Sequence, residues 1–243
     1  MEMSGRQNIT RDIGAEMCFV FRWIIVRYLF PQTKGGFSIH CREKKGGENI
    51  FLRLARKQKE RRTVGFYGVD SGVGTTHLAI AAANFAAGEW GVPTAVAELS
   101  GHPCIQDMDL SRNGSGHFEL EGVDYYPQME STQMPQLLNL SYRYLILDMG
   151  CNENSWQEFL RCDLKYVVAS FCPWRMRQAE IFMDTHETDQ TKKYFTALLT
   201  VTGNVYEKKR FQRKYHVPVR TIPFIADPFR LEKDQLSFFQ ELL

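Results

Sequence analysis

Short apolar runs alternate with helix-like stretches across residues 62–243, and this alternation constrains the fold more than any other feature of the sequence. Apolar runs of about four to eight residues are typical of strands that are buried on both faces, as in a parallel sheet. Helices between such strands cover the sheet. The sequence therefore predicts an α/β fold, with a mostly parallel twisted sheet and helices on both faces. The predicted strands are 63–67, 94–99, 123–126, 144–148, 164–170, 195–201 and 219–222, and the predicted helices are 76–87, 134–140, 174–184, 208–215 and 231–243.

A glycine-rich segment, residues 65–77, lies between the first predicted strand and the first predicted helix. Its glycines at 68, 72 and 74 let the backbone pass close to an anion, with N–H groups turned inward. The helix that begins near Thr76 adds unpaired N–H groups and the positive end of its dipole. The Thr76 hydroxyl stands where it can ligate a Mg²⁺ ion between phosphates. The segment predicts a phosphate site, although glycine-rich turns before helices also occur in α/β folds without phosphate.

The stretch Val69-Asp-Ser-Gly-Val-Gly-Thr-Thr-His77 resembles the deviant Walker A loop of MinD/ParA ATPases, P-loop proteins of the SIMIBI class, which reads G-K-G-G-V-G-K-T-T. The resemblance extends over roughly residues 62–243, in pattern more than in letters. It implies a bacterial, cytoplasmic P-loop NTPase-like domain that binds ATP or ADP with Mg²⁺ and forms a homodimer or docks on a protein partner. The nucleotide contacts that it implies within the loop are Gly68, Asp70, Ser71, Gly72, Val73, Gly74, Thr75, Thr76 and His77.

Further matches lie outside the loop. The Walker B aspartate, which holds the Mg²⁺ shell, falls at Asp148, the last residue of the predicted strand 144–148. Open α/β sheets bind ligands at the carboxyl ends of their strands, which favours a role for Asp148 beside Thr76. Glu98 stands where the family has an aspartate, so it either lies near Mg²⁺ or only ends a strand. The pair Asp227 and Pro228 resembles the stretch whose backbone borders the adenine.

The loop departs from the family at the residues that carry positive charge. The phosphate-binding lysine falls at Thr75, and the signature lysine, which reaches the partner subunit's nucleotide, falls at Asp70. The aspartate that positions the attacking water falls at Ser100. Losing one group that stabilises transition-state charge commonly costs about 10²–10³ in rate. Weak nucleotide binding with slow or absent hydrolysis is therefore expected. His77 either donates to a phosphate or is a surface histidine, and its pattern favours the second.

Three functions remain open at this point. The first is a nucleotide-binding switch or positioning protein of the MinD/ParA kind with weak or absent ATP hydrolysis. The second is a nucleotide-independent pseudo-ATPase scaffold for a secretion- or pilus-type machine, similar to the TadZ/CpaE localisation proteins. The third is an active small-molecule kinase or ligase on the same fold, which would require a lysine in the loop.

The first 61 residues form a basic N-terminal extension to the predicted domain 62–243. Residues 1–62 hold 14 Lys and Arg against 6 Asp and Glu, a net charge of +8, whereas residues 63–243 carry −6. The basic stretch 53–62 offers nonspecific contact with nucleic acid, although it lacks interleaved aromatics for base stacking.

An apolar run, Met17–Phe30, lies within this extension and carries Arg22 and Arg27. Its length of about 14 residues is short of the roughly 20 that a membrane span needs. It is a membrane-surface helix, a helix packed on the domain, or an upstream stretch wrongly included in the reading frame. The six cysteines are dispersed and form no C-x-x-C pair, which indicates reduced thiols of a cytoplasmic protein.

Overall fold

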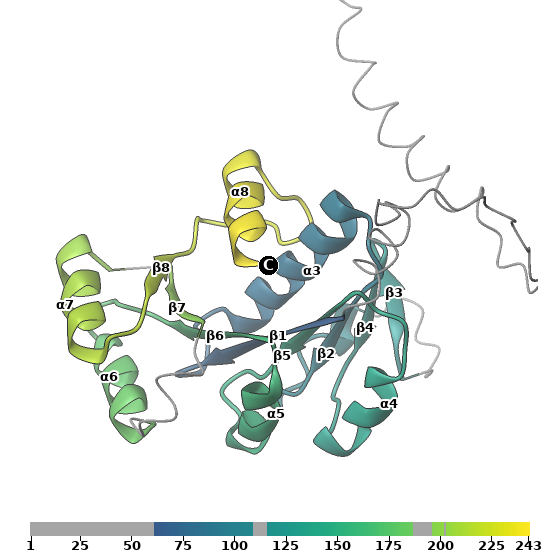
Figure 1. Cartoon of the computed structure of the whole chain (residues 1–243), viewed down its shortest axis with the longest axis horizontal. Helices are drawn as coiled ribbons and strands as arrows, with labels where there is room; N and C mark the ends of the chain where they lie inside the picture. The colour runs from purple at the N-terminus through teal and green to yellow at the C-terminus, as the bar shows by residue number, and fades with distance from the viewer. Residues whose placement is uncertain (1–60, 109–115, 187–195, 202) are drawn as a thin grey trace, which may run out of the picture. The chain divides into compact units, whose positions relative to one another are not determined.

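The computed structural model describes residues 61–108, 116–186, 196–201 and 203–243. Within these residues eight strands form one sheet in the order β3-β4-β2-β5-β1-β6-β7-β8 (Figure 1). Strand β3 is antiparallel to β4, and the other neighbouring strands are parallel. The predicted mostly parallel sheet is therefore confirmed. The strands are β1 Arg62–Gly68, β2 Thr94–Glu98, β3 Phe118–Leu120, β4 Val123–Tyr126, β5 Tyr144–Asp148, β6 Leu164–Ala169, β7 Ala197–Thr200 and β8 Val219–Thr221.

Helices cover both faces of the sheet, as predicted (Figure 1). Helices α3 and α8 bury Phe85 and Phe239 in the apolar core on one face. Helices α4, α5, α6 and α7 contribute to a second core on the opposite face. The helices are α3 Thr75–Trp90, α4 Met134–Leu138, α5 Trp156–Arg161, α6 Met176–Thr185, α7 Val205–Tyr215 and α8 Lys233–Leu242, with 3₁₀ turns η1 Gln106–Met108, η2 Ser131–Gln133 and η3 Glu153–Ser155.

The central strand β5 shows why the apolar runs do not alternate with polar residues. All five of its residues are buried. Ile146 belongs to the core under α3, whereas Leu145 and Leu147 belong to the core on the other face. Successive side chains point to opposite faces of a strand, so a strand covered on both faces needs apolar residues at every position. Each buried aliphatic side chain contributes about 1.5–3 kcal/mol relative to an exposed one.

Helix α3 lies directly against the sheet because its inner face is made of small residues. Ala79, Ala81, Ala82 and Ala83 are fully buried in the core that α3 shares with β1 and β5. The methyl side chains allow a close approach of helix and sheet. This packing fixes the first turn of α3 beside the carboxyl ends of β1 and β5.

Two elements were not predicted from the sequence. Strand β3 pairs with β4 through a two-residue turn, Glu121-Gly122, in which both residues have positive φ (51° and 77°). This is the geometry of a type I′ hairpin, which a residue followed by glycine can form. Helix α5 has six residues, too few to show a helical period.

The N-terminal extension lies outside the described residues, apart from Arg61. The hypotheses on residues 17–30 and 53–62 therefore stay predictions, and so does the domain boundary. At the start of β1, Arg62 donates a hydrogen bond from Nη1 to the Leu243 carbonyl at 2.7 Å. No helix in the described ranges is long and apolar enough to cross a membrane.

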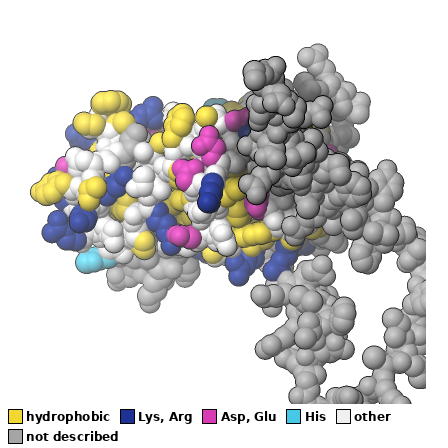
Figure 2. All heavy atoms as spheres, turned by 90° about the horizontal axis from the view of Figure 1, so that it is seen from above, with side chains coloured by type: hydrophobic (Ala, Val, Ile, Leu, Met, Phe, Trp, Pro, Cys, Tyr) yellow, Lys and Arg dark blue, Asp and Glu magenta, His cyan; other side chains and the backbone are white. Residues whose placement is uncertain are grey.

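The surface on the side of α3 and α8 is mixed in character. Hydrophobic, basic and acidic side chains are interspersed over the part of this face that the structure describes (Figure 2). Nucleic-acid-binding faces typically carry a continuous basic stripe. The described part of this face shows no such continuous stripe (Figure 2).

Candidate functional site

The loop between β1 and α3 curls at the mouth of the helix. Gly72 and Gly74 have φ of 69° and 93°, values that glycine adopts without the steric strain of a side chain. Between them, the Val73 side chain is buried and anchors the loop to the core under α3. Ser71, Gly72 and Gly74 are exposed. The predicted loop thus presents the glycine backbone at 72 and 74 outward and packs Val73, with the partly buried Val69, against the core.

The outer face of this loop has room for a ligand. A Cβ placed on Gly74 would meet no heavy atom within 4 Å, and one on Gly72 would meet only the Arg175 guanidinium, at 4.0 Å. Gly74 is the N-cap residue of α3, and no side chain caps that end of the helix. The N–H groups of the first turn have no acceptors within the helix, so they are available to an anion.

Thr76 and Asp148, the predicted magnesium residues, are in direct contact. The Thr76 hydroxyl donates to Asp148 Oδ2 at 2.6 Å, and the Gly150 amide donates to Oδ1 at 3.0 Å. Asp148 is fully buried. Burial raises the pKa of its carboxyl to about 6, the two hydrogen bonds oppose this rise, and the negative charge of Glu98 adds to it. A hydroxyl with a carboxylate behind it is one combination of oxygen groups that can hold a hydrated Mg²⁺ ion.

Glu98, the third predicted metal residue, holds backbone amides. Its Oε1 accepts from the amides of Cys104 at 2.7 Å and Ile105 at 3.2 Å, and its Oε2 accepts from the Gln128 amide at 3.2 Å. Three hydrogen bonds account for a buried carboxylate without a metal ion. Glu98 therefore orders two loops beside Asp148, its register partner on β5. Among the described residues, no group of three or more His, Cys, Asp and Glu side chains is placed to hold a metal ion.

Thr75, at the position of the phosphate-binding lysine, packs into the base of the loop. Its side chain is buried. A Cβ placed on Gly68 would lie 2.6 Å from Thr75 Oγ1 and 2.9 Å from Val73 Cγ2, so only glycine fits at position 68. The hydroxyl at residue 75 therefore faces the strand end, and it brings no charge to the outer face of the loop.

An arginine that sequence analysis missed clamps the loop from another element. Arg175, the N-cap residue of α6, donates from Nη1 to the Ser71 carbonyl at 2.8 Å and lies 3.7 Å from Asp70 Oδ2. Asp70 Oδ1 also accepts from the Ser71 amide at 2.8 Å. The two charged side chains are each 37% exposed, so their ion pair contributes at most about 1 kcal/mol. A single arginine at the start of the predicted helix 174–184 carries no signal that would identify it as a loop contact.

His77 links α3 to the predicted adenine segment. Its Nε2 lies 3.0 Å from the carbonyl oxygen of Ile225. Asp227 Oδ1 accepts from the Phe229 amide at 2.9 Å, which forms a local turn next to Pro228. The histidine thus has a backbone partner other than a phosphate, and it holds the segment 225–228 beside the first turn of α3.

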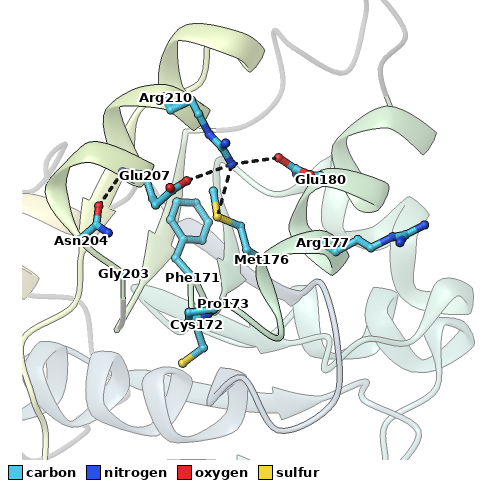
Figure 3. A pocket seen from close by; sticks show the side chains of 10 residues that line it. All are labelled: Phe171, Cys172, Pro173, Met176, Arg177, Glu180, Gly203, Asn204, Glu207 and Arg210. Atoms are coloured by element: carbon cyan, nitrogen blue, oxygen red, sulfur yellow. Dashed lines mark hydrogen bonds and ion pairs between the residues drawn. The ribbon is translucent and has the colours of Figure 1, made fainter.

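A hollow of about 540 Å³ lies between α6 and α7 (Figure 3). Arg210 of α7 reaches across it, 2.9 Å from Glu207 and 3.7 Å from Glu180 of α6. Arg177 points away from this group of charges (Figure 3). The positive charge of Arg210 is therefore balanced by two carboxylates. The loop before α6, which lines the hollow with Cys172 and Pro173, also positions Arg175.

The sheet order, the helices on both faces and the glycine loop define an α/β domain of the P-loop NTPase type. A ParA family ATPase from Chlorobium tepidum has the same fold, with a TM-score of 0.52 and 16% identity over 76% of this chain and 91% of that chain. A plasmid partition protein from Borrelia burgdorferi bound to AMPPNP has a TM-score of 0.54 and 15% identity over 76% and 97% of the two chains. The septum site-determining protein MinD from Pyrococcus horikoshii, complexed with Mg-ADP, has a TM-score of 0.53 and 14% identity over 75% and 94%.

Sequence comparison does not extend this result. No family model matches the chain, and no curated protein matches it significantly. At identities of 14–16% the structural similarity establishes the fold. The fold implied by the resemblance to MinD/ParA ATPases is therefore confirmed, while the roles of the individual site residues stay predictions.

Proposed function

We propose that this chain is a nucleotide-binding switch or positioning protein that takes ATP or ADP with Mg²⁺ at the loop 68–76. The observation that carries the proposal is the contact between Thr76 and Asp148 beside an uncapped helix N-terminus. The same fold binds AMPPNP in the Borrelia protein and Mg-ADP in the Pyrococcus protein. The residues present fit a phosphate-bound Mg²⁺ ion, because a hydroxyl, a carboxylate and free amides converge at one edge of the sheet.

Each part of the loop has a defined task in this proposal. A bound nucleotide would bring negatively charged phosphates to the helix mouth, and Mg²⁺ would neutralise part of that charge. The amides of residues 72–76 donate to phosphate oxygens. The Thr76 hydroxyl oxygen would serve as a ligand of the ion, while Asp148 accepts a hydrogen bond from that hydroxyl and so orients it. The backbone at Asp227 and Pro228 borders the base, held in place through His77 and Ile225.

Hydrolysis by this site is expected to be slow or absent. Thr75 is neutral and buried, and Asp70 brings a negative charge to the loop. Ser100 stands where a water-positioning carboxylate would act, and its hydroxyl donates to the His102 carbonyl at 2.7 Å. A rate-enhancing site needs positive charge at the transferred phosphoryl group, which these three residues do not supply.

The proposed switch acts in the cytoplasm through a homodimer or a protein partner. Support comes from the fold alone, which it shares with ParA and MinD. Nonspecific nucleic-acid contact through residues 53–62 and membrane contact through residues 17–30 remain secondary hypotheses, because both segments lie outside the described residues except for Arg61 and Arg62.

A nucleotide-independent scaffold, of the kind that localises or assembles a secretion or pilus machine, is the second candidate. The observation that favours it is the Arg175 clamp, which gives the Ser71 carbonyl and the Asp70 carboxylate protein partners without any ligand. Sedimentation velocity with and without ATP–Mg²⁺ separates the two candidates. Self-association that does not change with nucleotide supports the scaffold.

Titration with fluorescent ATP and ADP in the presence of Mg²⁺ tests the first candidate. Wild-type protein is expected to bind, and Thr76→Val to weaken binding about tenfold, because valine keeps the shape but removes the hydroxyl ligand. Thr185→Val is the matched control, since the Thr185 hydroxyl donates to its own helix, to the Ile181 carbonyl. Absence of binding by wild type at millimolar nucleotide would exclude the switch.

A further inference from the structure

We infer that Arg175 is the side chain that supplies positive charge to the phosphate loop, and that Asp70 competes with the ligand for it. The inference rests on the proposed nucleotide site and names the contact that replaces the missing lysines. It starts from the sequence of the loop, in which residues 69–77 contain no lysine or arginine. An anion at this loop would meet backbone dipoles and the Asp70 carboxylate, unless a cation arrives from another element.

The structure brings such a cation to the outer face of the loop. Arg175 Nη1 is bound to the Ser71 carbonyl, and Nη2 lies 4.0 Å from the position of a Cβ on Gly72. Gly72 is exposed, and the space beside Gly74 is open. The guanidinium therefore lies along the same edge where the amides face outward. A phosphate on those amides would lie within reach of the remaining N–H groups.

The geometry of the guanidinium suits a shared role. Arginine carries five N–H donors in a planar fork, and one of them serves Ser71. Within the described part of the chain, its contacts at the loop are the Ser71 carbonyl and the Asp70 carboxylate. The ion pair with Asp70 is long, at 3.7 Å, and each of its side chains is more than a third exposed, so it is weak and exchangeable. A polyphosphate carries more negative charge than the carboxylate and also accepts bidentate hydrogen bonds from arginine, so it displaces Asp70 from the guanidinium.

The position of Arg175 in the chain also suits a surface side chain that contacts a ligand rather than a core residue. Arg175 follows Trp174, which is 79% exposed, and precedes Met176, the first residue of α6, which is buried in the core on that face of the sheet. The backbone is thus anchored at one side while the long side chain stays at the surface. Rotation of the side chain from Asp70 to a ligand needs no change in the sheet or in α6.

The two possible roles of Arg175 predict different effects of changing Asp70. If the arginine only braced the loop, Arg175→Ala and Asp70→Asn would both loosen it and would weaken nucleotide binding together. If the arginine binds phosphate in competition with Asp70, the two changes act in opposite directions. Arg175→Ala removes the donor, whereas Asp70→Asn frees it and removes a like charge from the site.

The test is a binding isotherm of ATP–Mg²⁺ for the full chain and its variants at one ionic strength. Arg175→Ala is expected to weaken binding about tenfold, Arg175→Lys to restore part of that loss, and Asp70→Asn to tighten binding about threefold. Arg177→Ala is the matched control, because it removes the same charge from the same helix but points away from the charged group between α6 and α7 (Figure 3). Its effect is expected to stay below twofold.

If Arg175→Ala and Arg177→Ala weaken nucleotide binding equally, the effect comes from net charge alone, and the inference is overturned. Weakening by both Arg175→Ala and Asp70→Asn would overturn it in favour of a structural brace. These outcomes leave the nucleotide site standing, whereas absence of wild-type binding overturns the proposed function together with the inference. Thermal unfolding of each variant identifies any loss of fold, and Asp70→Asn tests the inference even if Arg175→Ala is unstable.

Discussion

At the end of β5, the Asp148 carboxylate is fully buried and is held by Thr76 and Gly150. Burial disfavours its charged form more than the two hydrogen bonds favour it, and the pKa rises from 3.8 to about 6. The residue that orients the proposed metal ligand is thus kept in place at a cost in stability. Such a cost at a site residue is common where position matters more than stability.

The pH dependence of stability follows from this shift. In unfolded chains Asp148 loses its proton near pH 3.8, but in the folded protein it retains the proton until about pH 6. The stabilisation of the protonated folded form is present at low pH and is lost as the pH rises through about 6. In Mg²⁺-free buffer, the free energy of unfolding of Asp148→Asn relative to that of wild type is expected to rise by about 2 kcal/mol from pH 4.5 to pH 7.5. Urea unfolding at both pH values measures this difference, and parallel pH profiles of the two proteins would contradict it.

At the scale of elements, α3 combines structural and functional demands. Its buried alanines set a short distance to the sheet, and its N-terminus closes the phosphate loop. The helix begins after Gly74 and ends at Gly91, both in the left-handed region. Glycine adopts this conformation without strain, and at Gly91 it stops the helical hydrogen-bond pattern. The close packing of the middle of α3 therefore fixes the geometry at its mouth.

Two substitutions in α3 test this arrangement. Ala81→Leu adds three carbons at a position with no exposed surface and is expected to lower the free energy of unfolding by about 1–3 kcal/mol. Gly88→Ala, on the exposed face where a Cβ meets no atom within 4 Å, is expected to raise it by about 0.5 kcal/mol. Denaturant unfolding of the two variants measures both changes. Equal changes in the free energy of unfolding would show that α3 does not pack against the sheet as described.

At the scale of the whole molecule, α8 completes the core on the α3 side. Phe239 is fully buried and its ring centroid lies 5.8 Å from that of Phe85. Leu242 and Leu243 are buried in the same core, and the Leu243 carbonyl accepts from Arg62 at the start of β1. The first strand and the last helix of the described domain are therefore joined, although they lie far apart in the sequence.

Two Phe→Ala variants test how much α8 contributes to the free energy of unfolding. Phe239→Ala is expected to lower the free energy of unfolding by about 3–5 kcal/mol, because it leaves a cavity between α8 and α3. Phe224→Ala removes the same atoms from a side chain that is 78% exposed and is expected to change stability by less than about 0.5 kcal/mol. Similar losses in both variants would contradict the placement of α8 on the core.

Much of the fold was predictable because its signals are local. Residues 144–148 read as a buried strand and form β5 over the same range. The period of the apolar residues, the glycines of the loop and the carboxylate at the strand end each act within a few residues. Helix α5 and strand β3 were missed because a short helix has no period and a three-residue strand is defined by its partner.

The sequence by itself determined the class of fold and the loop as a place for an anion, because strand–helix alternation and glycine conformations are properties of short stretches of chain. The tertiary structure alone decided what surrounds the loop. Arg175 meets Ser71 across 104 residues, and Glu98 is occupied by amides from two other loops. Contacts of this kind depend on which strand ends the sheet order brings together, and no local pattern encodes that order.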